Sequence, residues 1–246
     1  MSAHEHCVLG HVHTGTAIGT ESTIGDRKVY VIGDNKKNCL IYLTDVFGYE
    51  YNNHRLLADT FAKEIPVTVY IPDMLDKSGF VHLTPEELKN VDFPKFAEYN
   101  NKGKRFPQIQ AVADHLKGQY ENVFVVGYCW GAWGAVMLAA KPGLIAGVSI
   151  NHPSRMEMPG DLERLTSPTL IVAPYTDQAF PQKDRLVAEE IFDKKAKEDK
   201  LFMKIAVYPG FVHGFTARGN TEDVFTNEAI EDAKNETVLF FRKLIK

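Results

Sequence analysis

Short apolar runs alternate along the chain with longer segments of helical periodicity, and this alternation limits the fold more than any other feature. The runs are rich in β-branched residues and are bounded by turn residues, as expected of strands buried on both faces of a parallel sheet. We predict strands over Lys28–Ile32, Cys39–Thr44, Val67–Ile71, Val123–Val126, Gly147–Ile150, Thr169–Ala173 and Lys204–Tyr208. The first of these could instead be an antiparallel edge.

The segments between the strands place apolar side chains on one helical face. We predict helices over Asn53–Glu64, Pro107–Leu116, Ala132–Ala140, Pro181 to about Lys197, and Asn227–Leu244. Strands and helices in this order predict an α/β fold, with a mostly parallel, doubly wound sheet flanked by helices. The stretch Leu75–Lys104 is polar and the least regular, so a lid or a specificity insertion is expected there.

Length and charge narrow the class of protein. The chain has 246 residues, which suits one α/β domain over residues 1–246. Its formal net charge of −4 argues against nucleic-acid binding, because a polyanion partner requires a basic surface. No signal-peptide pattern and no apolar run of membrane-spanning length occurs, so we expect a cytoplasmic protein without a membrane partner. The three cysteines are an odd number at wide spacing, which fits neither a disulfide framework nor a four-cysteine zinc site.

A glycine-tyrosine-cysteine-tryptophan-glycine pentapeptide at residues 127–131 directly follows the predicted strand Val123–Val126 and precedes a segment of small residues. This is the context of the nucleophile elbow, a Gly-x-Ser-x-Gly motif between strand and helix, with cysteine here in place of serine. The flanking glycines allow the tight turn that presents the nucleophile. Cys129 is therefore the candidate nucleophile, and the alternative is a buried structural cysteine in a glycine-rich turn.

A thiol nucleophile needs a base, because the thiolate is the reactive form. In folds that use this elbow, the chain order is nucleophile, acid, histidine. Of the nine histidines, only His152 and His213 follow Cys129, and only His213 also follows a well-placed acid. His213 lies in a glycine-containing loop after the strand Lys204–Tyr208, where α/β folds place ligands. It is the candidate base, although a lone loop histidine can also be merely solvated.

Asp177 follows the predicted strand Thr169–Ala173 and is the candidate acid that orients His213. Helix capping is the rival role for this aspartate. If Pro181 occupies the first helical position, the cap falls at Phe180, three residues beyond Asp177, so capping explains the aspartate poorly.

An acyl-transfer site also needs backbone N–H donors for the developing oxyanion. The residue after the nucleophile normally supplies one of them, which here is Trp130. The loop after an earlier strand supplies another, and in this chain that strand is Cys39–Thr44. The second donor is therefore expected at Val46 or Phe47.

Together these features resemble the dienelactone hydrolase family of α/β-hydrolases, including its fungal members, which carry a Gly-x-Cys-x-Gly elbow and a Cys-Asp-His triad in this order. The resemblance covers most of the chain and includes residues 45–48, Pro72-Asp73, the elbow, Asp177, and His213-Gly214-Phe215 with Arg218. It implies an α/β-hydrolase fold and a small ester or lactone substrate that Cys129 attacks to form a thioester acyl-enzyme. No metal or other cofactor is expected.

The resemblance also suggests roles for three further residues. The best-known members carry a glutamate that engages the resting thiol, and Asp45 stands at its position. Arg218 could meet an anionic group of the substrate, or could be a solvated surface arginine. His152 follows the strand Gly147–Ile150 and is expected at the same rim, either lining the pocket or forming a turn.

Two other classes of function stay open, a redox sensor that uses Cys129 and a hydrolase-like protein without turnover. A metal site near the N-terminus is a weaker alternative. Histidine and cysteine crowd that segment, as His4, His6, Cys7, His11 and His13, but no spacing there matches a zinc module. No phosphate-binding glycine motif follows a strand, so no nucleotide cofactor is indicated.

Overall fold

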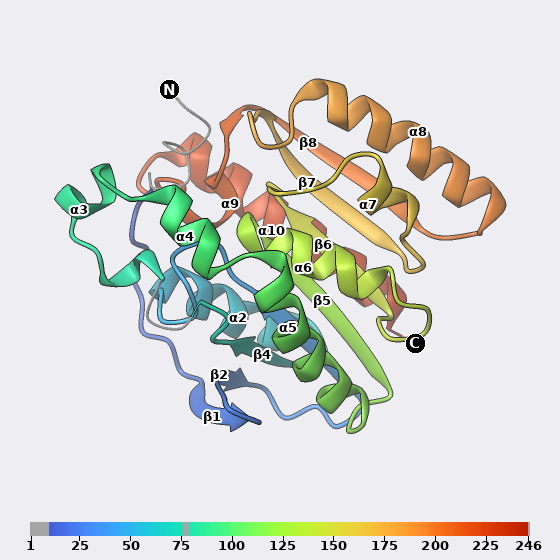
Figure 1. The fold of residues 1–246 in the computed structure, drawn as a ribbon, viewed down its shortest axis with the longest axis horizontal. Helices are drawn as coiled ribbons and strands as arrows, with labels where there is room; N and C mark the ends of the chain where they lie inside the picture. Colours follow the sequence, from blue (N-terminus) through green and yellow to red (C-terminus); the bar gives the residue numbers. More distant parts are fainter. Residues whose placement is uncertain (1–9, 76–78, 246) are drawn as a thin grey trace.

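The computed structural model describes residues 10–75 and 79–245, and these contain an eight-stranded sheet (Figure 1). Its strands are β1 (Thr20–Ile24), β2 (Arg27–Ile32), β3 (Asn38–Leu43), β4 (Thr68–Pro72), β5 (Asn122–Tyr128), β6 (Gly147–Asn151), β7 (Thr169–Thr176) and β8 (Met203–Val212). The spatial order is β1-β2-β4-β3-β5-β6-β7-β8, and all neighbours from β4 to β8 are parallel. This is the mostly parallel sheet of an α/β-hydrolase, as the sequence predicts.

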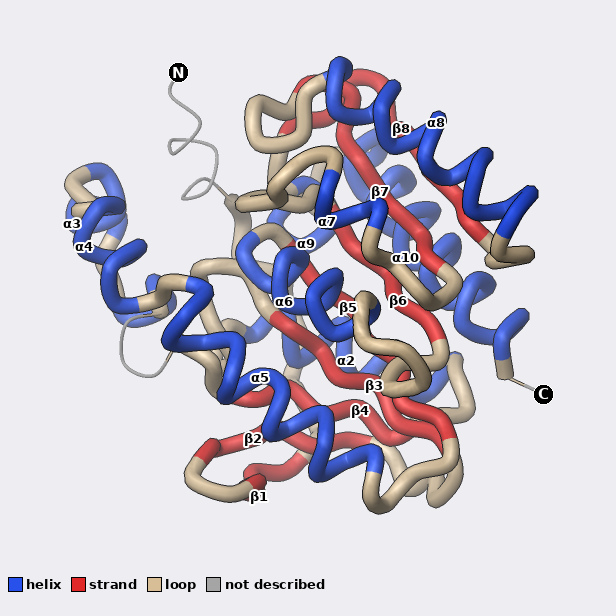
Figure 2. Tube along the Cα trace, turned by 45° about the vertical axis from the view of Figure 1, so that its right-hand side comes forward, coloured by secondary structure: helices blue, strands red, loops and turns tan. Residues whose placement is uncertain are grey.

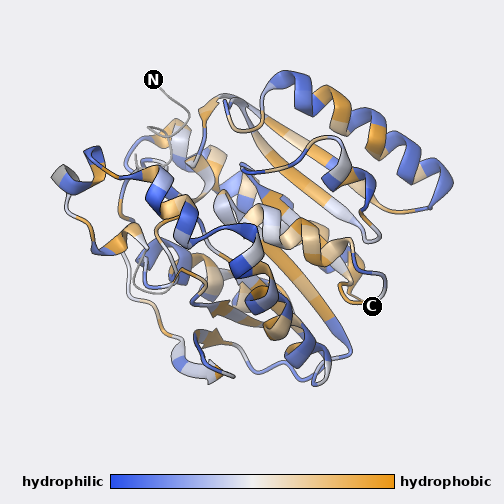
Figure 3. Ribbon diagram, viewed as in Figure 1, coloured by the Kyte–Doolittle hydropathy of each residue, from blue (hydrophilic) through white to orange (hydrophobic). Residues whose placement is uncertain are grey.

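Helices cover both faces of the sheet (Figures 1 and 2). One face packs against α2 (Asn52–Glu64), α9 (Phe215–Arg218) and α10 (Val224–Leu244), and the other against α5 (Lys102–Lys117), α6 (Trp130–Ala139), α7 (Gly160–Glu163) and α8 (Gln182–Glu198). Alternate residues of one strand point to opposite faces, so Leu40 and Tyr42 enter the core beneath α2 and α10, whereas Ile41 and Leu43 enter the core beneath α5 and α6. The apolar strands between polar outer helix surfaces are visible in Figure 3.

Strand β1 is absent from the sequence prediction. Four of its five residues are exposed, so it has no apolar run, and it is held by backbone pairing with β2. The connecting turn places Gly25 at φ 60°, a conformation that favours glycine. β2 is antiparallel to β4, as the edge alternative anticipates, but β1 lies outside it and forms the edge.

The irregular stretch between β4 and α5 contains short helices that the prediction misses. They are η2 (Phe80–His82), α3 (Pro85–Lys89) and α4 (Phe93–Tyr99). Polar side chains cap α4 and the following helix: Asp92 caps α4 by accepting from Lys95 N at 3.0 Å, and Asn101 caps α5 by accepting from Lys104 N at 3.0 Å. Helix α5 therefore begins at Lys102, and Pro107 lies inside it, not at its start. None of the described helices is long and apolar enough to span a bilayer.

Candidate active site

Cys129 lies at a sharp turn between β5 and α6, which confirms the predicted strand-turn-helix context. Its backbone has φ 47° and ψ −108°, values that non-glycine residues rarely adopt. Both flanking positions of the elbow, Gly127 and Gly131, require glycine because a Cβ atom there would not fit. A Cβ at Gly131 would lie 2.3 Å from the Leu43 carbonyl oxygen, and one at Gly127 would lie 2.8 Å from Ala132 Cα. The packing of β3 and α6 thus holds the cysteine backbone in a strained conformation.

Asp177 and His213 form a buried hydrogen-bonded pair. Asp177 follows β7, His213 follows β8, and His213 Nδ1 donates to Asp177 Oδ2 at 2.8 Å. The second carboxylate oxygen accepts from Ala179 N at 2.8 Å, so the aspartate is fixed on both sides. An imidazole whose Nδ1 carries the proton presents Nε2 as its basic nitrogen.

The structure brings Cys129 and His213 together with His152. The cysteine Sγ and one ring nitrogen of each histidine all lie within 4.8 Å of one another, and all three residues are buried. Ser154 also reaches the thiol, with its Oγ 3.6 Å from Cys129 Sγ. These groups come from residues that follow the carboxyl ends of β5, β6 and β8, where loops of parallel strands converge.

His152 is unusual in this group in both its backbone conformation and the surroundings of its ring. Its φ is 37°, and neither of its ring nitrogens has a hydrogen-bond partner among the described residues. Its ring meets that of His213 edge-on, with the centroids 4.9 Å apart. Burial lowers the pKa of His152 well below its usual value, and the nearby His213 lowers it further, so His152 is neutral at physiological pH.

Asp45 belongs to a separate buried network. Its carboxylate accepts from His54 Nε2 at 2.7 Å and from Phe47 N at 2.8 Å, and it forms an ion pair with Arg218. His54 Nδ1 in turn accepts from the Tyr42 hydroxyl at 2.8 Å. The Arg218 side chain is only 1% exposed, which rules out the alternative of a solvated surface arginine. The partners that the structure gives Asp45 are thus His54, Phe47 and Arg218.

The candidate oxyanion donors lie around Cys129. Trp130 is the first residue of α6, and Val46 lines the same pocket as the cysteine. The Phe47 N–H donates to the Asp45 side chain, so its hydrogen-bonding capacity is already used. Of the two residues predicted for the second donor, Val46 is therefore the better placed.

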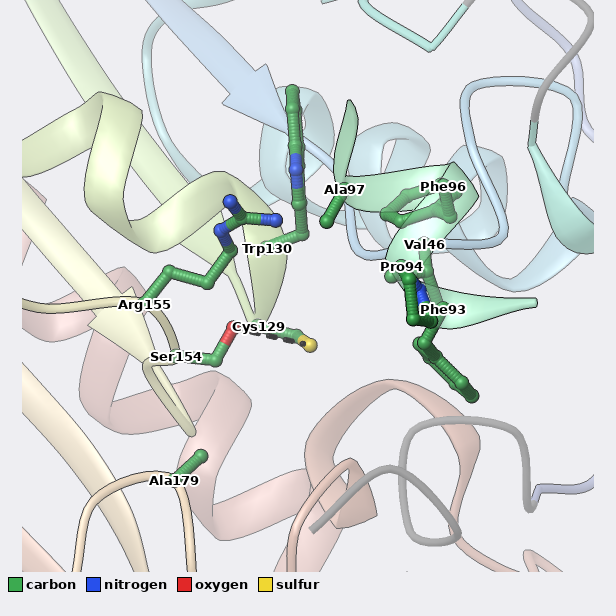
Figure 4. A pocket seen from close by; sticks show the side chains of 10 residues that line it. All are labelled: Val46, Phe93, Pro94, Phe96, Ala97, Cys129, Trp130, Ser154, Arg155 and Ala179. Carbon is green, nitrogen blue, oxygen red and sulfur yellow. Dashed lines mark hydrogen bonds between the residues drawn. The ribbon is translucent and has the colours of Figure 1, made fainter. Parts of the chain in front are cut away.

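A pocket of about 390 Å³ opens beside Cys129 (Figure 4). It is lined by Val46, Phe93, Pro94, Phe96, Ala97, Cys129, Trp130, Ser154, Arg155 and Ala179. Most of the wall is apolar, and residues 93–97 come from α4, in the stretch where the sequence predicts a specificity insertion. Arg155 contributes a positive charge. Burial lowers its pKa, and the charge of ionised Cys129 opposes that shift.

Sequence reasoning did not identify Ser154, Arg155 or His54 as parts of these networks. Ser154 and Arg155 closely follow β6, so their position at a strand end was an available signal. No local signal marks His54, which lies within the amphipathic helix α2 and meets Asp45 only in the folded protein. The N-terminal histidine and cysteine cluster, considered above only as a weaker alternative, falls partly outside the described residues, which begin at Gly10.

A mostly parallel sheet with a nucleophile elbow after β5, and with an acid and a histidine after later strands, defines an α/β-hydrolase. The model of the dienelactone hydrolase family matches residues 28–245, and the chain belongs to this family. Membership and the similar proteins support a carboxylic ester or lactone hydrolase.

Two curated proteins are similar over nearly the whole chain. The hydrolase tropI of Talaromyces stipitatus is 28% identical to this chain over an alignment 251 positions long. The alignment covers 98% of this chain and 96% of that protein. The human carboxymethylenebutenolidase homolog is 26% identical over 228 residues, which cover 86% of this chain and 85% of that protein. Among solved structures, a dienelactone hydrolase-like promiscuous phosphotriesterase from metagenomic libraries superposes with a TM-score of 0.66 at 17% identity, covering 93% of this chain and 98% of that one. This last likeness supports the fold alone.

Proposed function

We propose that the protein hydrolyses a small carboxylic ester or lactone with Cys129 as nucleophile, His213 as base and Asp177 as the residue that orients the base. The observation that carries this proposal is the hydrogen-bonded Asp177–His213 pair beside the elbow cysteine, at the wall of an apolar pocket. Family membership supports the reaction class, and the geometry of the three side chains supports the roles that we assign to them.

In the first half of the reaction, His213 Nε2 takes the proton of the Cys129 thiol, and the thiolate attacks the substrate carbonyl carbon. The backbone N–H groups of Trp130 and Val46 stabilise the negative charge that develops on the carbonyl oxygen. Asp177 holds the Nδ1–H tautomer and stabilises the imidazolium. Collapse of the tetrahedral intermediate breaks the carbon–oxygen bond, and the leaving alkoxide takes the proton from His213.

The second half of the reaction releases the acid. The alcohol formed in the first half stays tethered to the acyl group when the substrate is a lactone, and it leaves when the substrate is an open ester. His213 then removes a proton from water, the hydroxide attacks the thioester, and the cysteine sulfur leaves and regains its proton. No cofactor takes part in this scheme.

The pocket defines the class of substrate. Its walls include Phe93, Phe96 and Trp130, which suit a flat apolar body, and Arg155 suits a carboxylate or another anionic group. The human relative is named for a carboxymethylenebutenolide, a lactone with a carboxyl-bearing substituent. Such a lactone combines both features and is the first compound to test.

A panel of p-nitrophenyl esters and small lactones, with and without a carboxylate, tests the proposal on wild type, Cys129→Ala and Cys129→Ser. Hydrolysis by wild type that is lost in Cys129→Ala supports it, and mass spectrometry after rapid acid quench should detect the acyl group on Cys129. In Arg155→Met, KM should rise for carboxylate-bearing substrates more than for neutral ones. Full hydrolysis by Cys129→Ala would refute the proposal, and absence of turnover with stoichiometric oxidation of Cys129 by dilute peroxide would favour the redox sensor.

A further inference from the structure

We propose that Cys129, His152 and His213 form a binding site for Zn²⁺, and that occupation of this site reversibly blocks the hydrolase. A thiolate and two imidazoles are a donor set that zinc prefers, and three protein ligands leave one coordination position open to the pocket. The proposal concerns a site distinct from the histidine-rich N-terminal segment.

The geometry of the three donors is close to what zinc requires. Zinc–sulfur and zinc–nitrogen bonds of about 2.3 and 2.0 Å in a tetrahedron place donor atoms roughly 3.3–3.6 Å apart. In this protein the three donor atoms already lie within 4.8 Å of one another. Relative to the shortest tetrahedral separation, the donor atoms would have to approach one another by at most about 1.5 Å (4.8 − 3.3).

His152 is the observation that points to a ligand. A buried polar nitrogen without a hydrogen bond costs free energy, and both ring nitrogens of His152 are buried without one among the described residues. The backbone of this residue is anchored to β7, since His152 N donates to Val172 O at 2.8 Å.

Asp177 and His213 already have the arrangement that supports a metal ligand. A ligating histidine usually donates its second ring nitrogen to a carboxylate, which fixes the tautomer and raises the basicity of the ligating nitrogen. His213 Nδ1 makes this bond to Asp177. The Asp177 carboxylate and the Cys129 thiolate together offset the two charges of the metal, whereas the exposed Arg155 on the pocket side opposes it.

Binding releases one proton, because the thiol must ionise. The Cys129 S–H bond breaks, the sulfur bonds to Zn²⁺, the proton passes to the buffer, and each neutral imidazole donates a lone pair without losing a proton. The metal then occupies both the sulfur and the His213 Nε2 that the hydrolytic reaction needs. Inhibition, unlike binding itself, rests on the proposed function.

Titration of the full chain with Co²⁺, followed by competition with Zn²⁺, tests the site without any substrate. We expect one equivalent of Co²⁺ to give thiolate-to-cobalt charge-transfer absorption with the visible bands of tetrahedral coordination, and Zn²⁺ to abolish both. Ester hydrolysis should fall in parallel with Zn²⁺ occupancy and return with EDTA. If wild type has no esterase activity, the Co²⁺ spectrum still decides the metal site.

Variants separate this site from other donors in the chain. The double variant Cys7→Ala/Cys39→Ala should keep the charge-transfer band, and Cys129→Ala should lose it. His152→Gln should weaken binding by more than the 10- to 100-fold that outer-shell changes such as Asp177→Asn typically cost. Ser154→Ala is the matched control beside the thiol and should weaken binding by no more than about fivefold, the value of one ordinary hydrogen bond.

Three results would overturn the proposal. They are a Co²⁺ complex without thiolate charge transfer, a spectrum that persists in Cys129→Ala, and an affinity of His152→Gln equal to that of Ser154→Ala. The last of these would mean that His152 only packs against His213. If His152→Gln does not fold, the Cys129→Ala spectrum and the affinity of Asp177→Asn remain decisive.

Discussion

Two buried aspartate–histidine pairs lie near the carboxyl ends of the parallel strands. They differ in which group faces the second ring nitrogen of the histidine. In the Asp45–His54 pair, the second nitrogen accepts from the Tyr42 hydroxyl, and both side chains are 0% exposed. In the Asp177–His213 pair, the ring adjoins the thiol of Cys129. The chemical pair is the same, but one is closed by protein groups and the other borders a reactive atom.

We therefore expect the Asp45–His54 pair to contribute mainly to the stability of the fold and the Asp177–His213 pair mainly to the reaction. The Asp45 carboxylate also pairs with the buried Arg218 and fixes the Phe47 backbone, so its network joins the loop after β3 to α2 and α9. The Asp177 carboxylate binds His213 and Ala179 N, which lie in the loops after β8 and β7, and neither of these partners is a guanidinium. We therefore expect mutations in the two pairs to affect different measurements.

The largest expected effect is the loss of turnover in His213→Gln. Removal of the base of a nucleophilic triad typically lowers kcat by about 10⁴- to 10⁶-fold. His54→Gln is the matched variant, and its kcat should fall far less. Steady-state kinetics on one p-nitrophenyl ester makes the comparison, and equal losses in the two variants would end the distinction between them.

The second-largest effect is expected on the free energy of unfolding, and not on turnover. Asp45→Asn removes the carboxylate that faces a buried guanidinium, and such losses destabilise proteins by about 3–5 kcal/mol. Asp177→Asn should cost less, because the partner of Asp177 is an imidazole and not a permanent cation. Urea unfolding of both variants, with the free energy of unfolding as the readout, tests this order. A larger loss in Asp177→Asn would contradict it.

A pH dependence of stability should follow from the closed pair. Burial lowers the pKa of His54 from 6.5 to about 3, so between these values the unfolded chain binds a proton that the folded protein does not. Stability contributed by this group is therefore complete above pH 6.5 and is lost as the pH falls toward 3. Between pH 7.5 and pH 5 the loss from one such histidine is about 2 kcal/mol.

The variant His54→Gln isolates that contribution. The fall in the free energy of unfolding between pH 7.5 and pH 5 should be smaller than in wild type, while the part due to the buried His152 remains. Urea titrations at the two pH values measure it. An unchanged pH dependence would mean that His54 is not held neutral by burial.

The smallest effect is expected at the thiol itself. Ser154 Oγ lies 3.6 Å from Cys129 Sγ, a distance at which a sulfur hydrogen bond is weak. Loss of one ordinary hydrogen bond is worth about 1 kcal/mol, so Ser154→Ala should change kcat/KM by roughly fivefold. A loss comparable to that of His213→Gln would place Ser154 in the catalytic machinery.

The sequence predicted the parts of the fold that depend on periodic burial. Strands β3 to β7 are buried over most of their length because helices cover both faces, and each appears in the sequence as a largely apolar run. The edge strand β8 is only partly buried, and its sequence is less uniformly apolar. Strand β1 escaped prediction because it is stabilised by backbone hydrogen bonds at an edge, which leave its side chains exposed. The start of α5 was wrong because a cap at Asn101 lets the helix begin before Pro107.

The candidate site was predictable where motif and topology coincide. Cys129, Asp177 and His213 each follow a strand end, so a parallel sheet brings them to one edge. The partners of Asp45 could not be predicted in the same way, because Asp45 and Arg218 are 173 positions apart in the sequence and no periodic pattern marks their contact. The metal-binding arrangement around His152 likewise depends on side-chain directions. The assignment to the cytoplasm stays a prediction.

The short helix α4 supplies one wall of the pocket, whereas the proposed reacting groups all follow strands of the sheet. Selection can therefore act on the two independently: replacements at Phe93 or Phe96 would alter which molecules enter while sparing the machinery that cleaves them. Related proteins could therefore differ in the substrates that they accept through changes in this one helix, while the groups that carry out the reaction stay the same.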